Sequence, residues 1–188
     1  TVDLLDNPYV SCQHSHLDFS ESLVGRELSG IIDAIEEPVA IWDDVARREF
    51  TQHFPEIPLL SDETTFTVSD AYRQAQLGAI RRMAIKIPRT GFTMSKKLVH
   101  LAEMNNMAAQ ISTQAETDLG CAAGLQMACS SKQICLPCEI AYYEKGMYPE
   151  SLLVDPLVIK DGMMQLPDAP GNGVEVNWKV VDKYRIDL

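Results

Sequence analysis

Three residues with chemically useful side chains stand at the ends of short apolar runs. Glu36 and Asp62 end two successive runs, and Lys86 ends the next one along the chain. If these ends converge, the two carboxylates form an all-oxygen site of the kind that suits Mg²⁺, with Mn²⁺ as a second candidate. Lys86 has apolar neighbours on both sides, which predicts that its stem is buried. A lysine beside carboxylates or a metal acts either as a base with a lowered pKa or as a fixed cation that stabilises an enolate.

The same residues also have ordinary structural interpretations. Acidic side chains are exposed by default, and Glu36 and Asp62 would then cap the following helices or pair with Arg47 or Arg48. Lys86 would extend its ammonium group to solvent from the end of its strand. The choice between these interpretations depends on the elements that carry the residues.

The apolar runs recur at a nearly constant interval, with polar ends that lie 24 to 27 residues apart. Amphipathic stretches with helical spacing lie between them, at 68–79, 93–105 and 118–130. A parallel strand needs a crossover of about a dozen residues or more, usually a helix, so this pattern predicts repeated β-α units. The runs are Ile31–Glu36, Pro58–Asp62, Met83–Lys86, Ala108–Ser112 and Ile134–Glu139.

Catalytic residue types at successive strand ends favour a TIM barrel over a doubly wound sheet, because a barrel gathers such residues on one face. A complete barrel has eight strands, whereas this sequence has five runs and a possible sixth around Thr1–Leu5. We therefore predict an α/β fold in which residues 1–150 form the last five or six strands of a (β/α) barrel. An N-terminal capping domain and the first barrel strands are expected to be absent from this chain.

Residues 151–188 are rich in turn-forming residues and are predicted to form a separate C-terminal tail. Asp161-Gly162 lies between Val158-Ile159-Lys160 and Met163-Met164-Gln165, and this pair of residues is a strong signal for a tight turn. The tail is therefore expected to contain a β-hairpin.

Composition excludes several classes of partner. The 188 residues include 27 acidic and 16 basic ones, for a formal charge of -11, which disfavours binding to nucleic acid. No apolar run reaches the roughly 20 residues that a membrane span needs, and Thr1–Asp6 does not resemble a signal peptide. Five cysteines are an odd number and fit reduced thiols, so we expect a cytoplasmic protein that binds neither nucleic acid nor a membrane.

Several segments, in this order and spacing, resemble the enolase superfamily. Residues 35–38 read Ile-Glu-Glu-Pro, residues 57–63 read Ile-Pro-Leu-Leu-Ser-Asp-Glu, and residues 84–91 read Ala-Ile-Lys-Ile-Pro-Arg-Thr-Gly. Residues 156–162 and 166–174 are similar to the closing segment of mandelate racemase and muconate-lactonizing enzymes. The likeness extends from about residue 31 to the end of the chain.

The resemblance implies roles for individual residues. Glu36 and Asp62 match metal ligands on the fourth and fifth barrel strands, and Lys86 matches the acid-base lysine of the sixth. Glu116 resembles an acid after the seventh strand that binds or protonates substrate, although an acid at a helix N-terminus is also favoured by the helix dipole. Asp3 is the approximate match for the third metal ligand.

Other residues leave alternatives open. The region of the third ligand also offers Asp6, Gln13, His14 and His16. The family pattern has a second catalytic lysine on an earlier strand, which this chain does not contain. Phe92 replaces the second glycine of the usual Gly-Gly and is expected to narrow the approach to Lys86. Cys135 and Cys138 have the spacing of a redox motif, but their place in the predicted last strand favours packing.

The segment 108–113 lacks the histidine that mandelate racemases carry there, so Lys86 indicates the muconate-lactonizing branch. This resemblance implies metal-dependent abstraction of a proton next to a carboxylate through an enolate, by a racemase or epimerase, a cycloisomerase or a dehydrating lyase. The expected partner is a small carboxylate substrate. The alternative is a non-catalytic or incomplete barrel that acts in assembly. An open arc of strands exposes its edges, so we expect a homo-oligomer or association with the missing N-terminal part, and no activity from this chain alone.

Overall fold

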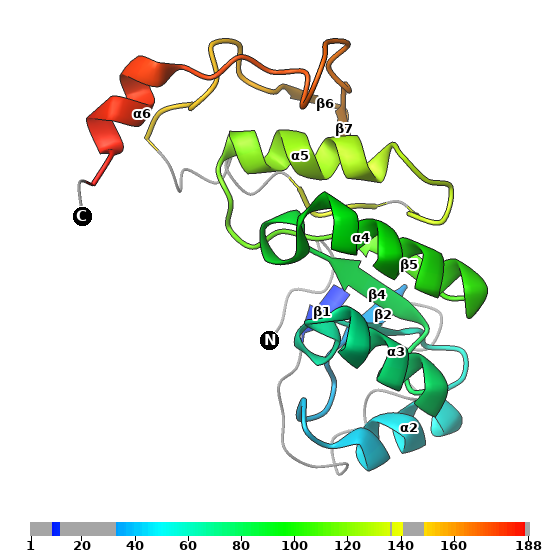
Figure 1. Cartoon of the computed structure of the whole chain (residues 1–188). Coiled ribbons are helices and arrows are strands. Elements are labelled where there is room, and N and C mark those ends of the chain that lie inside the picture. Colours follow the sequence, from blue (N-terminus) through cyan, green and yellow to red (C-terminus); the bar gives the residue numbers. More distant parts are fainter. Residues whose placement is uncertain (1–8, 12–32, 136, 141–148, 187–188) are drawn as a thin grey trace. The chain divides into compact units, whose positions relative to one another are not determined.

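The computed structural model describes residues 9–11, 33–135, 137–140 and 149–186 of the chain (Figure 1). They belong to two compact units. Unit 1 consists of Thr1–Ile85 and Lys96–Ala109, and unit 2 consists of Lys86–Ser95 and Gln110–Leu188. The predicted boundary between a barrel part and a tail at residue 150 stays a prediction.

Five strands form one sheet in the order β1-β2-β3-β4-β5. The pairs β1/β2, β2/β3 and β3/β4 are parallel, with Ile35 opposite both Val10 and Leu59. Four of the five predicted runs contain a strand, which confirms the repeated β-α pattern. The bounds are β1 Tyr9–Ser11, β2 Ala34–Glu36, β3 Leu59–Ser61, β4 Arg82–Ile85 and β5 Ala108–Ile111.

Two helices of unit 1 lie side by side after β2 and β3 (Figure 1). They are α2, Asp44–His53, and α3, Val68–Leu77, which follows the short 3₁₀ helix η2, Glu63–Thr65. The Asp44 carboxylate joins the two helices because it accepts hydrogen bonds from Gln74 and Arg73 of α3.

The N-terminus of α3 is fixed by a capping box. The Thr67 hydroxyl accepts from the Asp70 N–H, and the Asp70 carboxylate accepts from the Thr67 N–H, so two backbone donors are satisfied. The helix ends at Gly78, whose φ of 63° is a left-handed conformation that glycine adopts without strain.

Helix α4, Ile87–Met104, begins earlier than the predicted 93–105. Pro88 explains the difference, because proline is favoured in the first turn of a helix, where its missing N–H is not needed. Gly91, with φ of 61° and ψ of 175°, separates this first turn from the rest of the helix.

Unit 2 contains α5, Asp118–Ala128, α6, Trp178–Tyr184, and an antiparallel hairpin. The hairpin strands are β6, Ile159–Lys160, and β7, Met163–Met164, so the predicted hairpin is confirmed. Asp161 and Gly162 both have positive φ, as a two-residue turn of this kind requires.

The tail is anchored on α5. The Asp118 carboxylate, which is buried, accepts hydrogen bonds from the Leu152 N–H and the Ser151 hydroxyl. Cys121 and Ala122 of α5 pack with tail leucines in one buried cluster, so apolar burial and these polar contacts act at the same junction. The tail leucines in that cluster are Leu153 and Leu157.

The run Ile134–Glu139 was predicted as a strand, and its described residues do not form one. Pro137 explains this in part, since proline has no N–H to donate to a ladder. The Glu139 N–H still donates to the carbonyl of Ile111 at 2.9 Å, so this segment runs beside the end of β5. The possible strand at Thr1–Leu5 lies outside the described residues, and β1 was not predicted.

Candidate active site

Glu36 and Asp62 lie at the same edge of the sheet of unit 1. Ala34, Leu60 and Ala84 pack together in one buried cluster, so they share a face of strands β2, β3 and β4. Side chains of a strand alternate between faces, and Glu36 and Asp62 each lie two residues beyond a member of this cluster. The two carboxylates therefore continue the same face at the carboxyl ends of adjacent strands.

These two side chains fit the oxygen-donor preference of a divalent cation such as Mg²⁺. Asp62 is buried and Glu36 is half-buried. Within the ranges that the structure describes, no three His, Cys, Asp or Glu side chains are grouped as a metal site. Asp3, predicted as the third ligand, lies outside those ranges, and its assignment stays a prediction. The same holds for the alternatives Asp6, Gln13, His14 and His16.

Glu37 is a residue of this region whose importance the sequence did not reveal. It is 1% exposed and has a φ of 42°. Its Oε1 accepts hydrogen bonds from the Asp62 N–H at 2.6 Å, from the Thr64 N–H at 3.0 Å and from the Thr64 hydroxyl at 2.7 Å. One carboxylate oxygen thus binds the loop that carries Asp62.

A buried arginine lies behind Glu37. The Arg47 Nη2 lies 3.8 Å from the Glu37 Oε2 and donates to the carbonyl of Ala40 at 3.0 Å. The Arg47 Nη1 donates to the Asp44 Oδ1 at 3.1 Å. Burial lowers the pKa of Arg47, while the charges of Glu37 and Asp44 oppose that shift. The pairing with Arg47 was expected for Glu36 or Asp62, whereas these ion pairs of Arg47 are with Glu37 and Asp44.

Lys86 follows β4 directly and is 9% exposed, as its apolar neighbours predict. Its carbonyl accepts from the N–H groups of Arg89 at 3.1 Å and Thr90 at 3.2 Å, and from the Thr90 hydroxyl at 3.1 Å. The Thr90 Oγ1 also lies 2.7 Å from the Oγ of the buried Ser95. The backbone that carries Lys86 is therefore held by its own turn. Phe92, in the following turn, is 43% exposed.

Glu116, also in unit 2, folds back onto the turn before α5. Its Oε2 accepts from the Thr113 hydroxyl at 2.9 Å and from the Gln114 N–H at 2.5 Å. A Cβ at Gly120 would lie 2.6 Å from the Glu116 Cβ, so glycine leaves the room this arrangement needs. These contacts tie Glu116 to the turn before the helix, and its role in binding or protonating substrate stays a prediction.

Glu139 is a second carboxylate of unit 2 and was not predicted as a site residue. The Oε2 of Glu139 accepts a hydrogen bond from the Ser112 hydroxyl at 2.7 Å, and Ser112 is buried. The signal was present in the sequence, because Glu139 ends its apolar run as Glu36 and Asp62 end theirs. Glu139 therefore joins the candidate residues.

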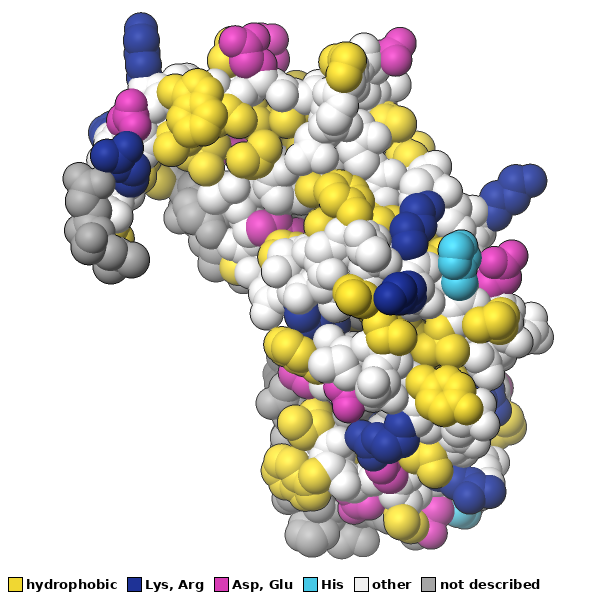
Figure 2. Space-filling view, in the orientation of Figure 1, with side chains coloured by type: hydrophobic (Ala, Val, Ile, Leu, Met, Phe, Trp, Pro, Cys, Tyr) yellow, Lys and Arg dark blue, Asp and Glu magenta, His cyan; other side chains and the backbone are white. Residues whose placement is uncertain are grey.

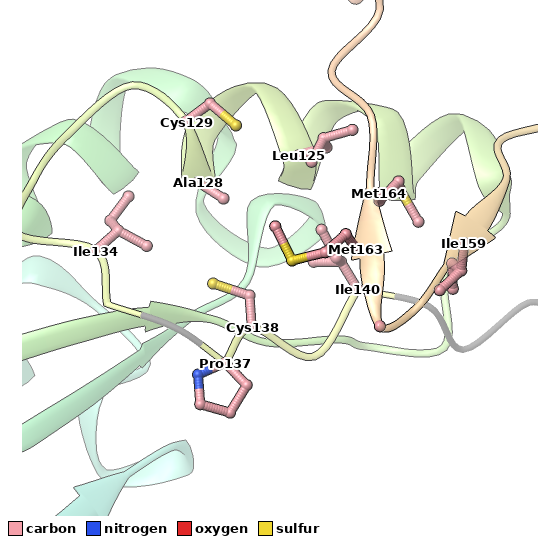
Figure 3. Close-up of a pocket in the computed structure, with 11 residues that line it drawn as sticks. Leu125, Ala128, Cys129, Ile134, Pro137, Cys138, Ile140, Ile159, Met163 and Met164 are labelled. Atoms are coloured by element: carbon pink, nitrogen blue, oxygen red, sulfur yellow. The ribbon is translucent and has the colours of Figure 1, made fainter.

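An apolar pocket of about 490 Å³ lies between α5 and the hairpin in unit 2 (Figure 3). Met163, Met164, Ile140 and Leu125 line it together with the thiols of Cys129 and Cys138. None of the candidate site residues lines this pocket. Its surface suits packing against apolar groups.

Cys135 and Cys138 have free thiols, and the Cys138 Sγ donates to the Cys135 carbonyl at 3.4 Å. Burial raises the pKa of the Cys138 thiol, with the nearby Cys135, Cys129 and Glu139 adding to the shift and a backbone hydrogen bond at Ile111 opposing it. A reactive redox cysteine has a lowered pKa, so this geometry favours the packing interpretation.

On the face drawn in Figure 2, the Lys and Arg side chains of each unit are interspersed with acidic and apolar ones. This distribution is unlike the continuous basic stripe of a nucleic-acid-binding surface. Of the helices in the described ranges, none has the length and hydropathy that a membrane span requires.

Comparison with known proteins places these residues in a family. Residues 15–180 match the family model described as enolase C-terminal domain-like. Muconate cycloisomerase 1 of Rhodococcus opacus is 30% identical over 162 residues, which cover 86% of this chain and 43% of that protein. The o-succinylbenzoate synthase of Bacillus subtilis is 28% identical over 151 residues, which cover 80% of this chain and 40% of that protein.

Solved structures agree with the sequence matches. The muconate lactonizing enzyme of Klebsiella pneumoniae superposes with a TM-score of 0.77 at 27% identity, over 86% of this chain and 45% of that one. The chain thus spans less than half the length of the relatives it matches. Its parallel β-α units are part of a TIM barrel followed by a C-terminal hairpin, as predicted. The chain belongs to the mandelate racemase and muconate-lactonizing branch of the enolase superfamily, and it corresponds to the C-terminal portion of these enzymes.

Proposed function

We propose that the protein containing this chain abstracts a proton next to a carboxylate of a small substrate, with the help of a divalent metal, through an enolate. The observation that carries this proposal is the placement of Glu36 and Asp62 on one face at the carboxyl ends of adjacent parallel strands. Lys86 follows the end of the next strand.

Glu36 and Asp62 would hold Mg²⁺ or Mn²⁺, together with a third ligand for which Asp3 is the candidate. When bound, such a cation stabilises negative charge on the substrate carboxylate oxygens, and the enzymes of this family generally depend on one. The Nζ of Lys86 can take up or give a proton, so Lys86 is the group that would remove or return the α-proton. Its stem is buried and its backbone is held by Arg89 and Thr90, which limits the positions that Nζ can reach.

Two further groups of unit 2 would assist at the substrate. Glu139, held by the Ser112 hydroxyl, offers a carboxyl group that can hold a proton near a substrate oxygen. Glu116 would bind or protonate substrate after leaving its contacts with Thr113 and Gln114.

The relatives support the reaction class that the sequence resemblance implies. They are muconate cycloisomerases, which are isomerases, and o-succinylbenzoate synthases, which are lyases. Both support a racemase or epimerase, a cycloisomerase or a dehydrating lyase that acts on a carboxylate. We further propose that the protein acts in the cytoplasm, and that this chain works in a homo-oligomer or together with the N-terminal part of the barrel rather than alone.

The test is exchange of the α-proton. The protein that contains this chain would be incubated with Mg²⁺ in heavy water and a panel of muconolactone-like acids, succinylbenzoate-like acids, N-acyl amino acids and dipeptides, each of which has an α-proton on a saturated carbon. We expect deuterium in at least one panel member, and loss of that incorporation in Glu36→Gln and Asp62→Asn. Incorporation that persists in both variants would refute the site, and its absence across the panel in the parent would favour a non-catalytic role in assembly.

A further inference from the structure

Glu37 differs from its neighbour Glu36 in almost every structural respect. Glu36 continues the face of the Ala34 cluster, whereas the side chain of Glu37 turns to the loop after β3. Its Oε1 accepts three hydrogen bonds, from both the N–H and the hydroxyl of Thr64 and from the N–H of Asp62. These contacts bridge 25 to 27 residues of sequence, so they define the position of one strand end relative to another.

The contacts are also protected from water. Glu37 is 1% exposed, Thr64 is 4% exposed and Asp62 is 5% exposed. Hydrogen bonds to a charged acceptor in such an environment are stronger than those between neutral groups, and they hold their partners in one geometry. Asp62 lies at the point where β3 ends and η2 begins. Its carbonyl accepts from the N–H and the hydroxyl of Thr65, and its N–H donates to the Glu37 Oε1, so Glu37 is the contact that ties this turn to the end of β2.

We propose that Glu37 is a positioning residue for the candidate metal ligand Asp62. The inference rests on the proposed function, since it assigns to Glu37 the task of holding Asp62 where it shares a cation with Glu36. Glu37 does this through the backbone of residues 62–64 and need not contact the cation. Removing a residue that hydrogen-bonds to a metal ligand commonly weakens metal binding by about 10-fold to 100-fold.

Three variants separate positioning from general stability. Glu37→Ala removes the acceptor of all three hydrogen bonds. Glu37→Gln keeps an Oε1 acceptor but loses the charge opposite Arg47. Ile57→Ala is the matched control, because Ile57 is buried before the start of β3 and its truncation destabilises unit 1 without removing a contact of the loop.

The experiment measures Mn²⁺ affinity by calorimetry and amide exchange by mass spectrometry, in the protein that contains this chain. We expect Mn²⁺ affinity to fall about 10-fold or more in Glu37→Ala and to stay within about threefold of the parent in Glu37→Gln and Ile57→Ala. Amide exchange of the segment with Asp62 and Thr64, measured without metal, should accelerate more in Glu37→Ala than in Ile57→Ala, whose faster exchange should be spread over unit 1.

The outcomes that overturn the proposal differ from those that overturn the metal site. Parent-like affinity and parent-like exchange in folded Glu37→Ala would refute the role of Glu37. An equal loss of affinity in Ile57→Ala would also refute it, because the effect would then follow stability. If Glu37→Ala does not fold, Thr64→Val gives the same test, with faster exchange and weaker Mn²⁺ binding expected from the loss of one hydrogen bond. If Glu36→Gln and Asp62→Asn bind Mn²⁺ like the parent, the metal site itself is wrong, and Glu37 then has no ligand to position.

Discussion

The guanidinium group of Arg47 lies 3.8 Å from the carboxylate of Glu37, and solvent reaches 0% of the first side chain and 2% of the second. The same guanidinium also bonds Asp44 and the Ala40 carbonyl. Removing one partner of a buried ion pair leaves the other charge without compensation, which is far more costly than losing an exposed pair.

Arg47→Met should therefore destabilise the protein by about 3–5 kcal/mol in denaturant unfolding. Arg48→Met is the matched control, since Arg48 is the next residue of α2 and is exposed, and a surface change of this kind stays within about 0.5 kcal/mol. Adding Glu37→Gln to Arg47→Met should recover part of the loss, because no charge is then left unpaired. An Arg47→Met protein as stable as the Arg48→Met protein would contradict the buried pair.

Cys138 should react slowly with alkylating reagents. Burial raises its pKa above the ordinary value of 9.0, so its thiolate fraction at pH 8 is small, whereas Cys129 is exposed. Iodoacetamide followed by peptide mapping should modify Cys129 before Cys138 in the native protein, and the difference should vanish in urea. The Cys138 rate should still be rising with pH above 9. Equal native rates at pH 8 would show that the thiol is not shielded.

The contact between α6 and Glu150 should depend on pH at both ends of the range. The Lys183 ammonium bonds the Glu150 carboxylate, and the Tyr184 hydroxyl donates to it at 3.1 Å. The hydrogen bond from Lys183 lowers the pKa of Glu150 below 4.5, and the hydrogen bond to Glu150 raises the pKa of Lys183 above 10.5.

These two shifts fix how the stability of the contact depends on pH. The stabilisation by Glu150 is fully present above pH 4.5 and is lost as the pH falls through the lowered pKa of Glu150. The stabilisation by Lys183 is present below pH 10.5 and is lost as the pH rises through the raised pKa of Lys183. Both groups are exposed and screened by solvent, so the effect is local. The protection of the α6 amides, taken as the intrinsic exchange rate at each pH divided by the observed rate, should be highest between these limits, and Glu150→Gln should remove its fall at acid pH. An unchanged acid dependence in Glu150→Gln would assign it to another group.

The repeated units were predictable because periodicity reports strand ends directly. The runs that end at Glu36, Asp62 and Lys86 contain β2, β3 and most of β4, since short apolar runs between turn signals at a regular interval are typical of buried parallel strands. Glu37 was not predictable, because its contacts with Asp62 and Thr64 join segments 25 and 27 residues apart. Sequence pattern describes local preference, whereas such contacts arise only when the strands have paired.

The end of β2 explains the difference between the neighbouring acids Glu36 and Glu37. Glu36 is the last residue of the strand and continues the face of Ala34. Glu37 lies beyond the strand with a φ of 42°, and its side chain turns to the loop after β3 and to the buried Arg47. The described residues of Ile134–Glu139 form no continuous strand, and the missing N–H of Pro137 limits ladder pairing there.

Lys86 is the residue on which the proposed chemistry depends most. If its Nζ exchanges the α-proton, Lys86→Ala should lower deuterium incorporation into an active panel substrate by about 10²–10⁴-fold, the usual loss for a positioned base. Lys97→Ala is the matched control, since Lys97 is exposed on α4. The rates should be compared at equal Mg²⁺ occupancy, measured separately, so that an effect on metal binding does not count as an effect on proton transfer.

Lys86→Arg keeps a positive charge but cannot act as a base at neutral pH, so it should be as impaired as Lys86→Ala if proton transfer is the role. If Lys86→Arg retains the parent rate within a few-fold while Lys86→Ala does not, Lys86 stabilises the enolate by its charge and another group moves the proton. If Lys86→Ala itself retains the parent rate, Lys86 takes no part in the chemistry.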